Sequence, residues 1–179
     1  RETLDLEDND AFDAFIRSKD IPAYDSDFPM YRWNVSIPAS LLEGRFEGVG
    51  QVQNMAVTER GPGGIAQVIQ IQGSSGTAQI RTQSQIRSQL GDASLVFHRN
   101  DGTDLTGSAT LPSAFISIHT EKSEDGSIVF RIYGGGFGHG AGMSQNGAQG
   151  MAKAGKSYRE ILDFFYREAQ VTESGGGSS

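Results

Sequence analysis

Hydrophobic and polar residues alternate along much of this chain, which is the pattern of half-buried β-strands. Between residues 31 and 37 aromatic and branched side chains alternate with polar ones, and similar runs recur downstream. The pattern predicts strands at residues 31–37, 51–60, 66–72, 77–81, 95–98, 114–119 and 128–133. A Gly-Pro-Gly-Gly turn at 61–64 is expected to join two of them.

Helical periodicity is confined to short segments with recognisable caps. Asp8 or Asn9 can cap a helix over 10–17, and Pro38 suits the first turn of a helix over 38–46. A Thr-Gln-Ser-Gln capping box predicts a helix over 83–90 that stops at Gly91. Near the end, Ser144 can cap a helix that continues to residue 154.

A second capping box, Ser157-Tyr-Arg-Glu160, opens the last predicted helix. Its buried side is expected to consist of Ile161, Leu162, Phe164 and Phe165. Together these elements predict an α+β fold with mainly antiparallel strands and short helices. A β-α-β-β-β-α lobe is expected to pack on a lobe that carries a glycine-rich loop and the C-terminal helices.

The predicted organisation has four parts. An acidic N-terminal helix and loop spans 1–30, and an α+β lobe spans 31–91. The second lobe spans 92–170, and a flexible linker ending in Gly-Gly-Gly-Ser-Ser spans 171–179. The chain begins Arg-Glu-Thr without a signal peptide, so we expect it to be a piece of a larger protein.

Charge and composition exclude several classes of protein. The net charge is −7, which argues against a nucleic-acid binder. Nine acidic and three basic residues lie within 1–27, so this segment alone carries −6. It is either a solvated face or a surface that docks a partner or cations. The chain has no cysteine, which excludes disulfides and thiolate metal sites, and no apolar run long enough to span a membrane.

The segment 133–148, Tyr-Gly-Gly-Gly-Phe-Gly-His-Gly-Ala-Gly-Met-Ser-Gln-Asn-Gly-Ala, is the strongest candidate for a site. Glycine at this density is typical of backbone that takes positive φ or approaches a ligand closely. The segment follows a predicted strand and precedes a predicted helix, an arrangement that presents backbone N–H groups and a few polar side chains together.

Three other kinds of site fit this sequence poorly. Residues 136–141 match a dinucleotide-binding G-x-G-x-x-A pattern, but only predicted helices and a linker follow, without the second strand that this fold requires. Ser144 follows Gly142 but lacks the second glycine of a nucleophile elbow, since position 146 is Asn, so a helix cap is the favoured role. His98, His119 and His139 lie on separate elements without zinc-ligand spacing, so we expect no metal site and no cofactor.

The residues 138–148, followed by Met151-Ala152, Gly155, Tyr158, 160–162 and Tyr166, resemble the C-terminal signature of the stage II sporulation protein D family (the SpoIID/LytB domain). The resemblance is strong over about residues 128–167 and weaker in the upstream lobe. It implies an extracytoplasmic bacterial domain that acts on cell-wall peptidoglycan. Characterised members of that family are lytic transglycosylases on glycan strands stripped of peptides, and LytB relatives enhance a wall amidase.

One departure from the family affects the expected chemistry. The family's catalytic acid is a glutamate in a Gly-Glu-Met-Pro pattern, which this sequence lacks. The resemblance therefore implies part of a lytic transglycosylase whose acid segment is absent from this chain, and no catalytic residue is assigned. The alternative is a non-catalytic module that binds peptidoglycan or enhances a wall hydrolase. In either case we expect glycan strands, and a cell-wall hydrolase, as partners.

For glycan recognition we assign polar and backbone contacts to the glycine-rich segment. The expected substrate-binding residues are His139, Ser144, Gln145, Gly138 and Gly140, with Phe137 or Tyr133 as a stacking face. Gln145 has an alternative role in capping or solvating the following helix. Arg131, Lys153 and Lys156 flank the segment and either contact carboxylates of the polymer or are simply solvated.

Overall fold

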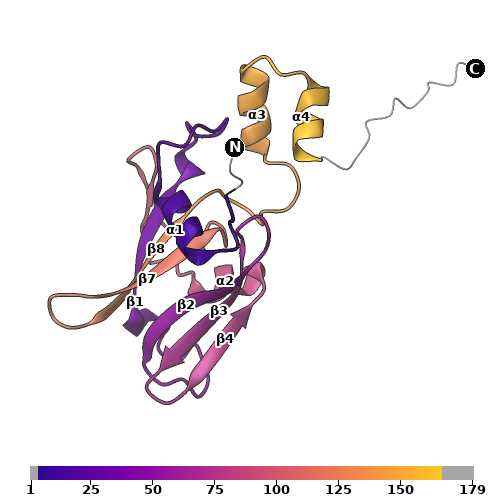
Figure 1. The fold of residues 1–179 in the computed structure, drawn as a ribbon. Helices are drawn as coiled ribbons and strands as arrows, with labels where there is room; N and C mark the ends of the chain where they lie inside the picture. Colours follow the sequence, from indigo (N-terminus) through magenta and orange to yellow (C-terminus); the bar gives the residue numbers. More distant parts are fainter. Residues whose placement is uncertain (1–3, 167–179) are drawn as a thin grey trace, which may run out of the picture. The chain divides into compact units, whose positions relative to one another are not determined.

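A computed structural model describes residues 4–166 of the chain (Figure 1). The helices are α1 (Asn9–Arg17), α2 (Gln83–Leu90), α3 (Gln145–Lys153) and α4 (Tyr158–Phe165), with short 3₁₀ helices at Pro29–Tyr31 and Ala39–Leu42. The strands are β1 (Trp33–Pro38), β2 (Val52–Arg60), β3 (Ala66–Gly73), β4 (Thr77–Arg81), β5 (Phe97–Arg99), β6 (Asp104–Leu105), β7 (Ile116–Lys122) and β8 (Ile128–Gly134).

The strands form two antiparallel sheets. One has the order β6-β5-β1-β8-β7 and the other the order β2-β3-β4, and every pairing between neighbours is antiparallel. The predicted α+β class with mainly antiparallel strands and short helices is confirmed. β1 pairs with β8 and β5, which lie far along the chain, rather than with β2.

The described chain divides into two compact units. The first contains residues 4–21 and 27–140, and the second contains residues 22–26 and 141–166. The first unit therefore holds both sheets, α1 and α2, and the second holds α3 and α4. The predicted boundaries at residues 31 and 92 stay predictions, and the predicted linker at 171–179 lies outside the described residues.

Local sequence accounts for the helix ends. The Asp8 side chain accepts a hydrogen bond of 2.8 Å from the Ala11 amide and caps α1, as predicted. Ser144 and Ser157 cap α3 and α4, and the second forms the predicted capping box with Glu160. Each cap satisfies an amide that the first helical turn leaves without a partner.

Two local predictions were wrong. The helix expected over 38–46 is only the four-residue 3₁₀ turn Ala39–Leu42, because Pro38 ends β1 and Gly44 takes a φ of +75° soon afterwards. The last helix was expected to bury one apolar side, but α4 has no buried residue within the part of the chain that the structure describes. Phe164 is 48% exposed.

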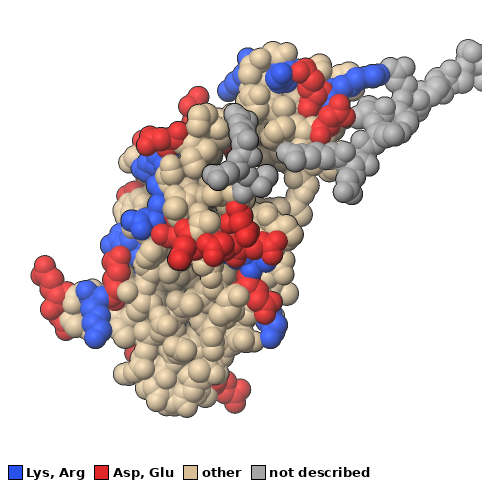
Figure 2. All heavy atoms as spheres, viewed as in Figure 1, with Lys and Arg blue, Asp and Glu red and all other residues tan. Residues whose placement is uncertain are grey.

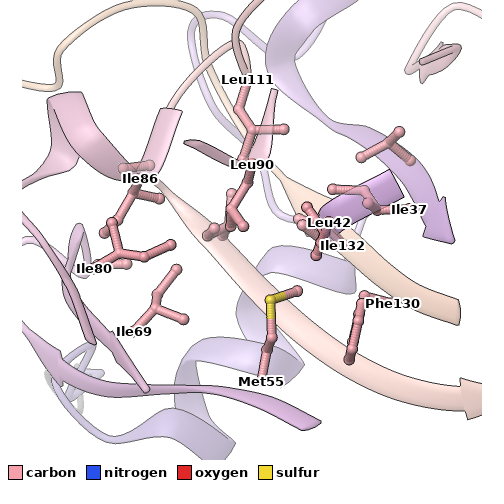
Figure 3. Close-up of a cluster of buried hydrophobic side chains, with 14 of the residues drawn as sticks. Ile37, Leu42, Met55, Ile69, Ile80, Ile86, Leu90, Leu111, Phe130 and Ile132 are labelled. Carbon is pink, nitrogen blue, oxygen red and sulfur yellow. The ribbon is translucent and has the colours of Figure 1, made fainter. Parts of the chain in front are cut away.

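The main hydrophobic core draws on both sheets and α2 (Figure 3). Ile37 and Phe130 come from the five-stranded sheet, Met55 and Ile69 from the three-stranded sheet, and Leu90 from α2. All five are essentially inaccessible to solvent. Burial of such side chains supplies most of the stability of a domain of this size, and it fixes β8, the strand that leads into the glycine-rich segment.

Candidate functional site

The glycine-rich segment is anchored where it leaves β8. Gly134 pairs with Trp33 on β1, and a methyl group added at Gly134 would overlap the Trp33 indole ring. The same indole donates a hydrogen bond of 3.1 Å from Nε1 to the Gly136 carbonyl oxygen. A large, buried aromatic ring therefore needs glycine as its neighbour and holds the start of the segment in place.

Several backbone groups of the segment already have partners in the protein. The amides of Gly135, Gly136 and Gly138 donate to the carbonyl oxygens of Phe115, Met30 and Pro112 at 3.0, 2.8 and 2.9 Å. The buried Ser113 hydroxyl donates to the Gly135 carbonyl at 2.7 Å. The Gly138 amide is thus used to hold the loop in place. A ligand could still approach Gly138 closely, because the residue has no side chain.

Beyond this base, glycines with unusual backbone angles alternate with residues of ordinary φ. Gly136, Gly138, Gly140 and Gly142 have φ of +75°, +135°, +71° and +78°. Residues other than glycine rarely adopt these backbone angles. Phe137 lies between Gly136 and Gly138, and His139 lies between Gly138 and Gly140. Both are exposed, and Phe137 is 66% exposed.

The predicted contact residues Ser144 and Gln145 belong to the second unit, at the start of α3. The Ser144 hydroxyl accepts a hydrogen bond of 3.0 Å from the Gly147 amide, which confirms its role as the helix cap. Gln145 is the first residue of α3, and both side chains are exposed. The binding roles of His139, Ser144, Gln145, Gly138 and Gly140 stay predictions.

Glycines within α3 have a packing role. A methyl group added at Gly147 would lie 3.0 Å from the Phe165 ring of α4, and one added at Gly150 would overlap the Tyr24 carbonyl. The high glycine content after residue 144 therefore has a structural cause within this unit, since larger residues would force its parts away from one another.

The other two histidines have structural partners, as expected. His98 lies 2.8 Å from Asp104 through Nδ1, and His119 lies 2.7 Å from Asp13 through Nε2. Arg131 forms an ion pair with Glu121 at 3.2 Å, and Lys156 forms one with Glu160 at 2.9 Å. These pairs are exposed and are worth little energetically.

Asp13 stands at the centre of a polar cluster that the sequence did not reveal. Its Oδ1 accepts from the Ser117 hydroxyl at 2.6 Å and from His119, and its Oδ2 meets Arg17 at 3.3 Å. Burial raises the pKa of this carboxyl, but the hydrogen bonds from Ser117 and His119 outweigh it and hold the pKa below 3.8. A carboxyl held in its ionised form is unsuited to donate a proton near neutral pH.

The same direction holds for the other carboxyls whose pKa is shifted. Hydrogen bonds from Ser94, Thr103 and Ser127 lower the pKa of Asp92, Asp101 and Asp125, and Ser157 lowers that of Glu160 to about 2. A general acid in a glycosidase needs the opposite, a raised pKa. Within residues 4–166 we therefore assign no catalytic acid.

Acid titration is expected to expose the contribution of Asp13 to stability. Its pKa is lower in the folded than in the unfolded chain, so its contribution is present above about pH 4 and is lost as pH falls through the folded pKa. Chemical denaturation between pH 5 and 2.5 should therefore show a steeper loss of unfolding free energy for the wild type than for Asp13→Asn. If the unfolding free energies of the two proteins fall equally steeply with pH, the stabilising role of the Asp13 carboxylate is contradicted.

Acidic side chains gather across the middle of one face of the molecule, around the label of α1 in Figure 1 (Figure 2). The N-terminal segment contributes Asp5, Glu7, Asp8 and Asp10, all exposed. A solvated face and a docking face both stay predictions for this segment. Across the described residues, no helix has the length and apolar character needed to cross a bilayer.

Comparison with known families and proteins gives two kinds of match. The family model described as "Domain of unknown function (DUF8618)" matches residues 1–142. The chain is also similar to an "Amidase enhancer" of Bacillus subtilis strain 168, with 37% identity over 68 residues, which is 38% of this chain and 9% of that protein.

Two further relatives are named "Stage II sporulation protein D". The protein from Bacillus subtilis strain 168 is 51% identical over 39 residues, covering 22% of this chain and 11% of the relative. The protein from Bacillus amyloliquefaciens is 42% identical over 53 residues, covering 30% and 15%. The matched stretches are thus a small part of these relatives. No solved structure matches this chain significantly.

Proposed function

The chain belongs to the DUF8618 family, and we propose that it is a cell-wall domain of the SpoIID/LytB type that binds glycan strands of peptidoglycan outside the bacterial cytoplasm. The names of the partial relatives, "Amidase enhancer" and "Stage II sporulation protein D", support this proposal. They agree with the resemblance of the glycine-rich segment to the SpoIID/LytB signature. The observation that carries it is the glycine-rich segment, which is anchored at Trp33 and exposed at Gly136, Phe137 and residues 139–146.

The chemistry of the segment suits a polar polymer. Sugars are bound by hydrogen-bonding side chains and by aromatic faces. The exposed Phe137 ring offers such a face, and His139, Ser144 and Gln145 offer hydrogen-bonding groups. Gly136 and Gly138 leave open space where side chains would otherwise stand, because an added methyl group at either position meets nothing within 4 Å. A glycan strand can therefore approach the protein backbone closely at these two positions.

Bond cleavage needs a general acid, and we propose that it comes from a segment outside the described residues. In the proposed enzyme, a carboxylic acid from another segment protonates the glycosidic oxygen, and the 6-hydroxyl of the sugar then closes an anhydro ring. The described chain contributes binding and orientation. Without the acid, the factor of roughly 10² to 10⁴ from general-acid catalysis is lost. This chain alone is then expected to bind glycan strands without releasing anhydro-sugar products.

Substitution of the exposed polar residues tests the binding role. For the His139→Ala/Gln145→Ala variant we expect about tenfold weaker binding to purified, peptide-free glycan strands, because two hydrogen bonds are lost. The melting temperature should stay unchanged, since both side chains are exposed. Binding is measured by co-sedimentation or calorimetry.

The matched control is Gln53→Ala, which removes an exposed polar side chain from β2. It should bind strands as the wild type does. Equal affinity of the His139→Ala/Gln145→Ala variant and the control would exclude the glycine-rich segment from the binding surface. Release of anhydro-sugar products by the wild-type chain would contradict the absence of an acid.

A second candidate function is enhancement of a wall hydrolase through the acidic face. The exposed carboxylates of the N-terminal segment favour it, as does the relative named "Amidase enhancer" (Figure 2). A basic hydrolase captured at low salt and released at high salt, with no effect of His139→Ala, would support this function over strand binding.

A further inference from the structure

The first unit contains a cationic hollow beside β1 and β5. Its volume is about 240 Å³, and its lining includes Arg17, Lys19, Arg32 and Arg99. Among residues 4–166, the lining contains no aspartate or glutamate. In a chain with a net charge of −7, four cations around one hollow without a carboxylate indicate a local positive potential.

The carboxylates nearest to these cations already have other donors. Asp13 meets Arg17 but also accepts from Ser117 and His119. The Asp101 carboxylate accepts from the hydroxyl and amide of Thr103, which lower its pKa, and the charge of Arg99 makes a smaller contribution in the same direction. Arg17 and Arg99 therefore share these carboxylates with other hydrogen-bond donors.

A third carboxylate, that of Asp104, pairs at 2.8 Å with His98, which lines the hollow. The Nε atom of Arg99 is buried and has no hydrogen-bond partner within residues 4–166. A buried donor without a partner is costly, so the Arg99 side chain, which lines the hollow, keeps unused hydrogen-bonding capacity.

We propose that this hollow binds an anionic oxygen group, a carboxylate or a phosphate. Arginine suits such groups because its planar fork donates two parallel hydrogen bonds to two oxygens. The volume is below the roughly 300 Å³ typical of sites for whole ligands, so the hollow accommodates a charged substituent of a larger molecule. This site shares Tyr133, one of the two alternative stacking residues, with the glycan-contact residues assigned above, but none of the assigned hydrogen-bonding residues.

The rest of the ligand has an adjoining place. A second hollow of about 480 Å³ shares His98 with the first and is lined by the hydroxyl side chains Ser36, Ser40 and Ser94. Ser36 lies on β1, where exposed and buried positions alternate, and it faces solvent. A ligand whose anionic group enters the cationic hollow therefore finds hydroxyl groups for a polar neighbouring part.

The single tryptophan of the chain provides a direct probe, because Trp33 lines the cationic hollow. We expect saturable shifts of the Trp33 indole N–H signal in NMR titrations with inorganic phosphate or acetate at constant ionic strength. For Lys19→Gln/Arg99→Gln we expect the dissociation constant to rise about tenfold, since two charges are removed. The control Arg81→Gln/Lys122→Gln removes two exposed cations elsewhere and should bind as the wild type does.

The titrations also distinguish the sources of the anion. Tighter binding of phosphate indicates a phosphorylated ligand, and tighter binding of acetate indicates a carboxylated one. Absence of a saturable shift with both anions in the wild type would overturn the proposal, as would equal affinity in the two double variants. If Lys19→Gln/Arg99→Gln unfolds, the exposed Lys19→Gln single variant decides in its place, because unchanged affinity there contradicts the site.

Discussion

Replacement of Phe130 by alanine is expected to lower the free energy of unfolding by about 3 to 5 kcal/mol. Phe130 is completely buried on β8, in the core that joins the two sheets and α2 (Figure 3). The substitution removes apolar contacts and leaves a cavity that surrounding strands cannot fill without losing their pairing. Urea denaturation followed by circular dichroism measures the change.

Phe137→Ala is the matched control for this prediction. It makes the same chemical change only seven residues later, but at a side chain that is 66% exposed. Its effect on the unfolding free energy should stay within about 0.5 kcal/mol. Similar destabilisation by the two substitutions would mean that Phe137 is packed rather than presented to solvent. That result would contradict the exposed state of the glycine-rich segment.

Replacement of Gly134 by alanine is expected to destabilise the protein by about 3 kcal/mol, although it adds a single methyl group. The new methyl group would overlap the Trp33 ring, so either the indole or β8 must move. Movement of the indole would also break its hydrogen bond to the Gly136 carbonyl. Thermal unfolding and a changed Trp33 fluorescence spectrum should report both consequences.

Gly63→Ala provides the comparison for the glycine substitution. Gly63 is exposed in the turn between β2 and β3, has no unusual φ, and has open space where a methyl group would stand. We expect little loss of stability there. If Gly134→Ala is equally mild, Trp33 does not require glycine at its neighbour on β8.

Strong local signals allowed much of the fold to be predicted. β4 and α2 have the predicted bounds, because alternation and an N-capping threonine define them within a few residues. The order of strands could not be predicted in the same way. The pairing of β1 with β8 and β5 depends on side chains that meet only after the chain has folded, such as Trp33 against Gly134.

The candidate site was predicted in part. Glycine density identified the segment, and the structure shows its anchoring at Trp33, Ser113 and Pro112. Sequence could not reveal that the Gly138 amide is already used within the protein. Nor could it reveal the cationic hollow, since Arg17, Arg32 and Arg99 come from three separate elements and acquire a shared environment only in the folded chain.

The alternation of glycines in the segment separates positions whose backbone angles favour glycine from positions that present a side chain. Positions 136, 138 and 140 require backbone angles that other residues rarely reach, whereas positions 137 and 139 carry side chains that support no core. The backbone is thus expected to accommodate other side chains at positions 137 and 139 more easily than at positions 136, 138 and 140. Relatives can change what the segment recognises through these few side chains without redesigning the scaffold, much as hypervariable loops do on an antibody.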